Sequence, residues 1–195
     1  KTNINCDPTF LLDFNVEFDE ERKALIQKFR KLTQKPIIAL MTKNNTIGLK
    51  VKEKFGDDYF ILAVYYPNQG ADYFMADMSP QEWAVAFSLY AACVTQLFHA
   101  TVFSLKNKLP FVSFDNNSDY DGRSTKISDI LSRSDLSENY FNLRNENYKI
   151  ENLLSQLHKN IDNPQIEKME KAVENQKKLF YPFVDELKKV INERR

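Results

Sequence analysis

The chain has 195 residues, of which 43% are hydrophobic and 28% charged, which is typical of a globular protein with one good core and excludes a disordered or fibrous chain. Lysine plus arginine and aspartate plus glutamate each number 27, so the net charge of zero provides no general attraction to nucleic acid or anionic lipid. The longest apolar run, residues 83–94, is too short to span a bilayer, so we expect no transmembrane segment.

The two cysteines lie far apart and form no metal-spaced pair. Cys93 lies in an apolar stretch, so we expect a buried thiol rather than half of a disulfide with Cys6. A reducing, cytoplasmic location follows as the expectation. The chain begins at Lys1 rather than at a methionine, and we expect it to be a processed or truncated product.

The first half of the chain predicts two helices that alternate with two strands. Asp19–Leu32 has acidic residues in its first turn and apolar residues on one side, as an amphipathic helix does. Ile37–Met41 is a short, continuous apolar run, which is typical of a buried parallel strand. Residues 46–55 predict a weaker helix because of Gly48, and residues 59–66 predict a strand rich in aromatic and branched side chains.

The clearest local signal in the sequence is the start of the next helix. Ser79 suits the N-cap, Pro80 the first helical position and Glu82 the third, which together make a capping box. We expect this helix to run to about Tyr90.

The following residues continue the alternation of strands and helices. We expect a strand at 91–95, a helix at 99–106, a strand at 111–114, a polar loop at 115–122 and an amphipathic helix at 126–134. This order predicts a parallel sheet with helices on both faces.

The tail, residues 163–195, predicts one long helical segment. Its apolar residues keep helical spacing, and we expect this stripe to pack across the domain rather than to bind a cofactor. Pro182 should kink or split the helix, because proline removes a backbone donor and clashes with the preceding turn.

Several chemistries are excluded by residue type. Four glycines, none in a suitable cluster, leave no P-loop and no dinucleotide fingerprint. His99 and His158 are too far apart for a local metal motif, and no neighbouring cysteines supplement them. We therefore expect neither a metal nor a bound cofactor.

One segment is a candidate site. The strand 91–95 leads through a short turn to His99, which opens a helix. Ligands of parallel α/β sheets collect outside the carboxyl ends of strands, and a helix N-terminus there suits a phosphate or carboxylate. An imidazole in this place can bind an anion or transfer a proton. Spacing alone favours a merely structural role for His99, and His158 is expected to be a surface residue.

Four segments, taken together in their order, resemble the polysaccharide pyruvyl transferase family. Residues 7–13 (DPTFLLD) resemble the family's D-P-T-x-L-L signature, and residues 78–83 (MSPQEW) its M-S-P-E-E-[FW] helix start. Residues 98–104 (FHATVFS) resemble F-H-G-T-[AV]-F-S, and residues 123–140 are similar to a further R-x-x-x-[IV]-x-x-L-L stretch. The lysine- and glutamate-rich tail also fits, so the resemblance spans nearly the whole chain.

The resemblance implies a fold and an activity. Family members have two Rossmann-like domains that face a cleft, as in B-type glycosyltransferases. They use phosphoenolpyruvate to place a pyruvyl ketal on a sugar of a surface polysaccharide. On this resemblance, residues 1–195 are a single α/β domain, the C-terminal, donor-binding domain of a transferase. Its partners are phosphoenolpyruvate, a saccharide acceptor and the N-terminal domain of the same parent protein, without nucleic acid.

The resemblance also implies site residues. The matching histidine, His99, is implicated in handling phosphoenolpyruvate, which makes it the expected catalytic residue. Its neighbours Phe98, Ala100 and Thr101 are expected to contact substrate. Arg123 and Lys126 are candidates to add positive charge from the next loop, although a solvated surface role explains both equally well.

Departures from the family pattern leave two alternatives open. Leu97 stands where the family commonly has a serine or an arginine, and Ala100 replaces a glycine. A catalytically inactive, family-derived binding or scaffold domain is therefore one alternative. The other is a nucleotide-sugar glycosyltransferase domain, which binding of a nucleoside diphosphate in the same cleft would favour.

Overall fold

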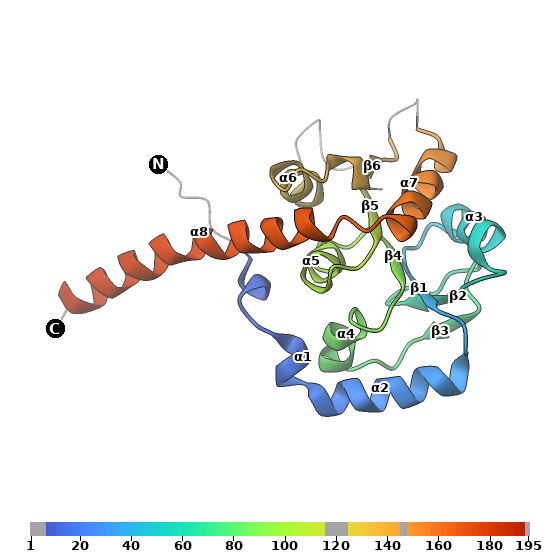
Figure 1. Cartoon of the computed structure of the whole chain (residues 1–195), viewed down its shortest axis with the longest axis horizontal. Helices are drawn as coiled ribbons and strands as arrows, with labels where there is room; N and C mark the ends of the chain where they lie inside the picture. Colours follow the sequence, from blue (N-terminus) through green and yellow to red (C-terminus); the bar gives the residue numbers. More distant parts are fainter. Residues whose placement is uncertain (1–6, 116–124, 145–147, 194–195) are drawn as a thin grey trace.

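The computed structural model describes residues 7–115, 125–144 and 148–193, and within them six parallel strands form one sheet in the order β3-β2-β1-β4-β5-β6 (Figure 1). The strands are β1 Ile37–Met41, β2 Phe60–Val64, β3 Tyr73–Met75, β4 Ala92–Thr95, β5 Phe111–Asp115 and β6 Tyr140–Asn142. The helices are η1 Pro8–Phe10, α1 Phe14–Glu17, α2 Asp19–Leu32, α3 Asn45–Phe55, α4 Pro80–Ala86, α5 Phe98–Asn107, α6 Lys126–Arg133, η2 Ser137–Asn139, α7 Ile150–Asp162 and α8 Ile166–Glu193.

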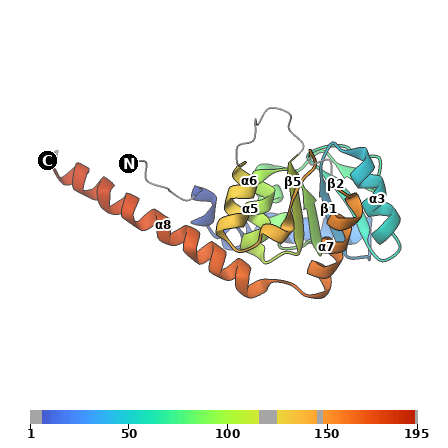
Figure 2. The same ribbon diagram turned by 90° about the horizontal axis from the view of Figure 1, so that it is seen from above.

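Helices cover both faces of this sheet, as the alternation of elements predicts. On β1, Ile37, Ala39 and Met41 join one buried cluster, whereas Ile38 and Leu40 join the other. Figure 2 shows α5 and α6 on one side of the strands and α3 and α7 on the other. Strands that are buried on both faces must be apolar throughout, which explains the continuous apolar runs in the sequence. The strand order is that of a Rossmann-like fold.

The capping box and the four predicted strands are confirmed. Ser79 accepts a hydrogen bond from the Glu82 N–H at 3.1 Å, and the Glu82 carboxylate accepts one from the Ser79 N–H at 2.8 Å. The helix that follows ends at Ala86, earlier than the predicted Tyr90. The strand predicted at 59–66 ends at Val64, because Tyr65 has φ 73° and cannot continue an extended strand.

Six elements were not predicted, namely η1, α1, η2, β3, β6 and α7. β3 and β6 have three residues each and lie at the two edges of the sheet, where pairing with a neighbouring strand decides their conformation. α7 was missed although its sequence carries a signal. Leu153, Leu154 and Leu157 are buried at helical spacing and pack against the face of the sheet that α3 also covers.

Gly48, which weakens the prediction of α3, has a structural reason to be glycine. A Cβ at Gly48 would lie 1.8 Å from Asn68 Oδ1, and a Cβ at Gly70 would lie 1.9 Å from the Gly48 carbonyl carbon. The helix and the loop after β2 therefore approach each other too closely for any larger residue. The need for this close approach explains why a glycine stands inside α3 despite its low helix propensity.

The long C-terminal helix is partly as predicted. Of the two predicted effects of Pro182, a kink or a split, the split is wrong, because α8 continues through Pro182; Figure 1 shows a gentle curve along the helix rather than a sharp corner. The residues around Pro182 are exposed, so water can satisfy the carbonyl that loses its donor.

The stripe of α8 packs on the domain only in its first half. There Met169, Ala172 and Gln176 are buried. Beyond them the helix projects away from the sheet with exposed apolar side chains, namely Tyr181, Phe183, Leu187, Val190 and Ile191. The expectation that the whole stripe packs across the domain is therefore wrong for the second half.

Candidate functional site

The strand order places a switch point between β1 and β4, where the connections leave toward opposite faces of the sheet. α3 follows β1 on one face, and α5 follows β4 on the other. The two loops are joined at the carboxyl edge, where the Thr42 hydroxyl donates to Gln96 Oε1 at 2.6 Å. In open α/β sheets, this edge is where ligands bind.

His99 is the second residue of α5, and its side chain is 61% exposed. It lines a hollow of about 430 Å³ together with Tyr65, Met78, Ser79, Pro80, Trp83, Leu97, Phe98 and Phe103. Most of these residues come from the segments that follow β2, β3 and β4. The hollow therefore lies at the carboxyl edge of the sheet, and among the described residues of its lining only His99 has a side chain that can carry a positive charge.

The start of α5 offers backbone donors beside this hollow. Leu97 occupies the N-cap and makes no capping bond with its side chain. Within the described residues, no acceptor contacts the N–H groups of Phe98, His99 and Ala100, while the Thr101 N–H already bonds the Leu97 carbonyl. Unpaired donors at the positive end of a helix dipole suit an anion.

A carboxylate from the beginning of the chain lies next to the histidine. Asp7 Oδ2 is 3.6 Å from His99 Nε2. Partial burial by itself would raise the pKa of Asp7, but hydrogen bonds from Thr9 and the nearby positive charges of His99 and Lys126 outweigh it and lower that pKa. Asp7 is therefore ionised at neutral pH.

Lys126, at the start of α6, lies near the same residues. Its Nζ lies 5.8 Å from the centre of the Phe98 ring, within range of a cation–π contact. The start of α6 is held by Asp115 at the end of β5, whose carboxylate accepts hydrogen bonds from Thr125 Oγ1 and from the Tyr140 hydroxyl. Burial, aided by Asp115, raises the pKa of Tyr140 to about 12, so this phenol stays a donor.

The predicted site residues fall into three groups. His99 and Phe98 line the hollow, and Lys126 lies near the Phe98 ring. Ala100 and Thr101 are buried, and the Thr101 hydroxyl bonds the Leu97 carbonyl and Ser113 Oγ, so only their backbone is near the hollow. Arg123 lies outside the described residues.

Sequence reasoning gave no role to Asp7, Tyr65 and Trp83. Asp7 belongs to the quoted motif at residues 7–13, but nothing in the sequence says that it lies beside a histidine 92 positions later. Tyr65 has a left-handed backbone that a bulky residue rarely adopts, and such strain is visible only in the structure. Trp83 follows the capping box, which was the one available signal.

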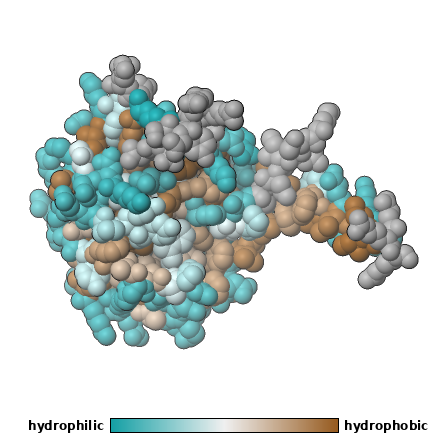
Figure 3. Space-filling view, turned by 180° about the vertical axis from the view of Figure 1, so that it is seen from behind, coloured by the Kyte–Doolittle hydropathy of each residue, from teal (hydrophilic) through white to brown (hydrophobic). Residues whose placement is uncertain are grey.

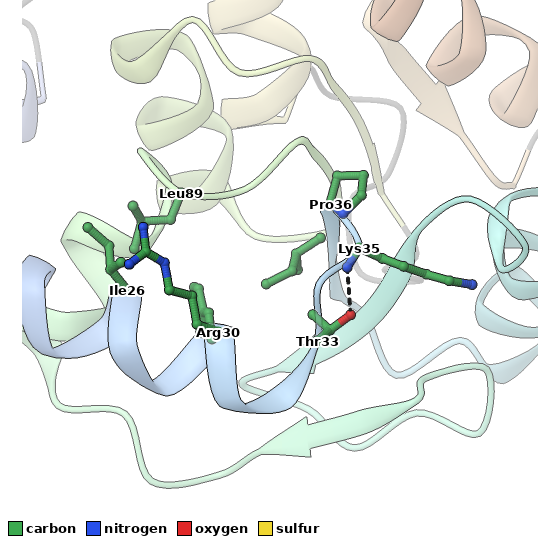
Figure 4. Close-up of a pocket in the computed structure, with 8 residues that line it drawn as sticks. Ile26, Arg30, Thr33, Lys35, Pro36 and Leu89 are labelled. Carbon is green, nitrogen blue, oxygen red and sulfur yellow. Dashed lines mark hydrogen bonds between the residues drawn. The ribbon is translucent and has the colours of Figure 1, made fainter.

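A second hollow, of about 210 Å³, lies at the opposite edge of the sheet (Figure 4). It is formed by α2, by the residues before β1 and by Leu89. Lys35 extends away from it and donates to the carbonyls of Gly56 and Asp57 at 3.1 and 2.6 Å. Parallel sheets bind ligands at the carboxyl edge rather than at this amino edge, so the hollow beside His99 is the candidate site.

The part of the chain that the structure describes holds no group of three or more His, Cys, Asp or Glu residues placed to bind a metal. Among the same residues, no helix is long and apolar enough to cross a membrane. Cys93 is buried, and burial raises the pKa of its thiol to about 12, so it is not a reactive thiolate.

Comparison with known proteins places the chain in a family. No curated protein sequence matches it. The family model for polysaccharide pyruvyl transferase matches residues 1–118, which is more than half of the 195 residues. The match includes the motifs at 7–13, 78–83 and 98–104 and ends before residues 123–140. The chain therefore belongs to the polysaccharide pyruvyl transferase family.

Proposed function

We propose that this chain is the C-terminal, donor-binding domain of a pyruvyl transferase that moves a pyruvyl group from phosphoenolpyruvate to a sugar of a surface polysaccharide. The observation that carries the proposal is the position of His99 in a hollow at the carboxyl edge of the sheet, at the start of α5. Family membership supports phosphoenolpyruvate and a saccharide as the substrates.

Phosphoenolpyruvate carries a phosphate and a carboxylate, so its site must supply donors and positive charge. The N–H groups of Phe98, His99 and Ala100, which have no acceptor among the described residues, would donate hydrogen bonds to one of these anionic groups. His99 in its protonated form would neutralise the departing phosphate or donate a proton to it. Lys126 would add positive charge at the rim of the hollow.

The rest of the hollow suits an uncharged molecule. Tyr65, Trp83 and Phe98 contribute aromatic side chains to its walls. A sugar ring presents C–H groups that pack on such aromatic faces. The acceptor saccharide would therefore lie against these walls with a hydroxyl directed at the donor beside His99.

The projecting half of α8 supports the existence of a partner domain. Figure 3 shows apolar side chains along this part of the molecule, where Phe183, Leu187 and Ile191 are exposed. A stripe of this kind is stable in water when another surface covers it. We place the N-terminal domain of the parent protein there. The isolated 195-residue chain should then release no phosphate from phosphoenolpyruvate with any acceptor glycan, and robust turnover by it would refute this division.

The test of the proposed function is His99→Ala in the full-length parent protein. Removing an acid or anion stabiliser should lower phosphoenolpyruvate-dependent turnover by about a hundredfold or more. Stability should change little, because the side chain is 61% exposed. His158→Ala is the matched control, since His158 is equally exposed but lies on α7, away from the hollow.

The inactive scaffold remains the second candidate, and one observation favours it. Leu97, which stands where the family commonly has a polar or cationic residue, lines the hollow and offers no side-chain donor. No turnover of phosphoenolpyruvate by the full-length protein with any acceptor would favour this candidate, whereas unchanged turnover in His99→Ala would show that another residue carries the catalysis. Displacement of phosphoenolpyruvate by a nucleoside diphosphate would instead favour a nucleotide-sugar enzyme.

A further inference from the structure

We propose that Asp7 is a positioning residue for His99. Its carboxylate orients the imidazole toward the hollow and favours the protonated, cationic ring. The proposal rests on the proposed function, in which His99 acts on an anionic donor. It assigns a role in the site to the first residue of the D-P-T motif, which also caps η1.

The two carboxylate oxygens of Asp7 have separate partners. Oδ1 accepts a hydrogen bond from the Thr9 N–H at 2.9 Å and so caps η1, while Oδ2 faces His99 Nε2 at 3.6 Å. The capping bond fixes the rotation of the carboxylate. Oδ2 is therefore held in place rather than free to follow any nearby cation.

The segment that carries Asp7 is itself fastened to α5. Phe10, two residues after the start of η1, is fully buried in the core. Lys106, in the last turn of α5, donates from Nζ to the carbonyl of Thr9 at 2.5 Å and also to the carbonyl of Leu12. The C-terminal end of α5 thus holds the segment that carries Asp7, and the N-terminal end of α5 carries His99.

Other titratable groups lie near His99 on neighbouring elements. Lys126 is a cation that acts on Asp7 from α6. Tyr65 lies in the lining of the same hollow, and the Glu82 carboxylate of α4 is engaged by the Ser79 N–H. Lys106 lies within electrostatic range of Asp13 and of Asp7 itself. Among the described residues, Asp7 is the only carboxylate in ion-pair distance of His99.

An imidazole with a carboxylate at one nitrogen has two advantages here. The carboxylate limits rotation of an exposed ring, so that less freedom is lost when the anion binds. It also stabilises the cationic form, which both neutralises phosphate and holds the proton to be donated. Distances in an unliganded site are often longer than in the reacting complex, so 3.6 Å is compatible with this role.

The experiment is an NMR titration of the two histidine rings in the 195-residue chain and in two variants. Asp7→Asn keeps the N-cap, because asparagine caps helices as well as aspartate does. It should lower the titration midpoint of His99, because one nearby negative charge is lost, and leave that of His158 unchanged. Asp162→Asn is the mirror control, because Asp162 Oδ2 lies 3.5 Å from His158 Nε2.

Three outcomes would overturn the proposal. The first is a His99 midpoint that does not move in Asp7→Asn, the second is a His99 midpoint that rises, and the third is a joint fall of both histidine midpoints, which indicates a general change. None of these depends on catalysis, so they are distinguishable from failure of the proposed function, which only His99→Ala in the full-length protein tests.

A second readout separates positioning from simple structural support. In the full-length protein, Asp7→Asn should move the basic limb of the kcat/KM profile to lower pH, because a less basic His99 loses its proton earlier. Asp7→Glu, which keeps the charge, should restore part of the shift. A uniform loss of activity with an unmoved pH profile would show that Asp7 only supports the fold.

Discussion

Two histidines of this chain have nearly the same immediate environment and very different surroundings. His99 Nε2 is 3.6 Å from Asp7, and His158 Nε2 is 3.5 Å from Asp162. The two imidazoles are also equally accessible, at 61% and 59% exposed. Ion-pair distance and exposure therefore do not distinguish the two histidines.

The difference lies in where the partners come from. Asp162 is one turn after His158 on the same helix, so that pair forms wherever α7 forms and costs little to assemble. Asp7 and His99 are brought together by tertiary packing, and Lys126 joins them from a third segment. Three distant segments that meet beside a hollow at a sheet edge indicate a site, whereas a local pair indicates a helix surface.

The largest effect should come from breaking the tether of Asp7. Phe10→Ala removes a fully buried ring and should lower the free energy of unfolding by about 3–5 kcal/mol. Leu157→Ala, on the inner face of α7, should cost about 2–5 kcal/mol. Phe10→Ala should also change the titration midpoint of His99, because it loosens the segment that carries Asp7. Leu157→Ala should leave the titration midpoint of His158 unchanged, because His158 and Asp162 lie on the same helix. Urea unfolding and histidine NMR measure the two quantities, and Phe10→Leu serves if Phe10→Ala does not fold.

A smaller effect is expected from the cation beside the hollow. Lys126→Ala should weaken phosphoenolpyruvate binding by roughly three- to fivefold, as an exposed charge contact does. Lys159→Ala, which removes a lysine next to His158, should have no effect. Trp83, the single tryptophan of the chain, lines the hollow, so its fluorescence can report binding. Equal effects of the two lysines, or a difference that persists in 1 M salt, would argue against a local electrostatic role.

The smallest effect concerns Lys106, which holds the η1 segment and has no counterpart near His158. Burial, together with Lys177, lowers the pKa of Lys106 from 10.5 to about 8, against the opposing carboxylates of Asp13 and Asp7. Between pH 8 and 10.5 the unfolded chain binds more protons at Lys106 than the folded chain does. The free energy of unfolding therefore increases with pH in this range. Urea midpoints from pH 8 to 10.5 should therefore rise more steeply in the native chain than in Lys106→Met. Parallel curves would show that the Lys106 ammonium is not desolvated.

Much of the fold could be predicted because its signals are local. The apolar run of β1 and the capping box of α4 each lie within a few residues, and each appears in the structure within one or two residues of the predicted start. β3 and β6 could not be predicted, since three edge residues carry no periodicity. The same limit applies to α8, where the apolar spacing is uniform but only the first half meets the domain.

The sequence by itself determined that this is a parallel α/β protein of the polysaccharide pyruvyl transferase family with His99 at the start of a helix, because strand runs, caps and family motifs are written in consecutive residues. Only the tertiary structure decided that Asp7 lies at His99, that Lys126 covers Phe98 and that the Thr101 hydroxyl is turned into the core. Those contacts depend on how α5, α6 and η1 pack on one face of the sheet. Each of these contacts joins residues that are far apart in the sequence, so it forms only when the elements that carry them pack together.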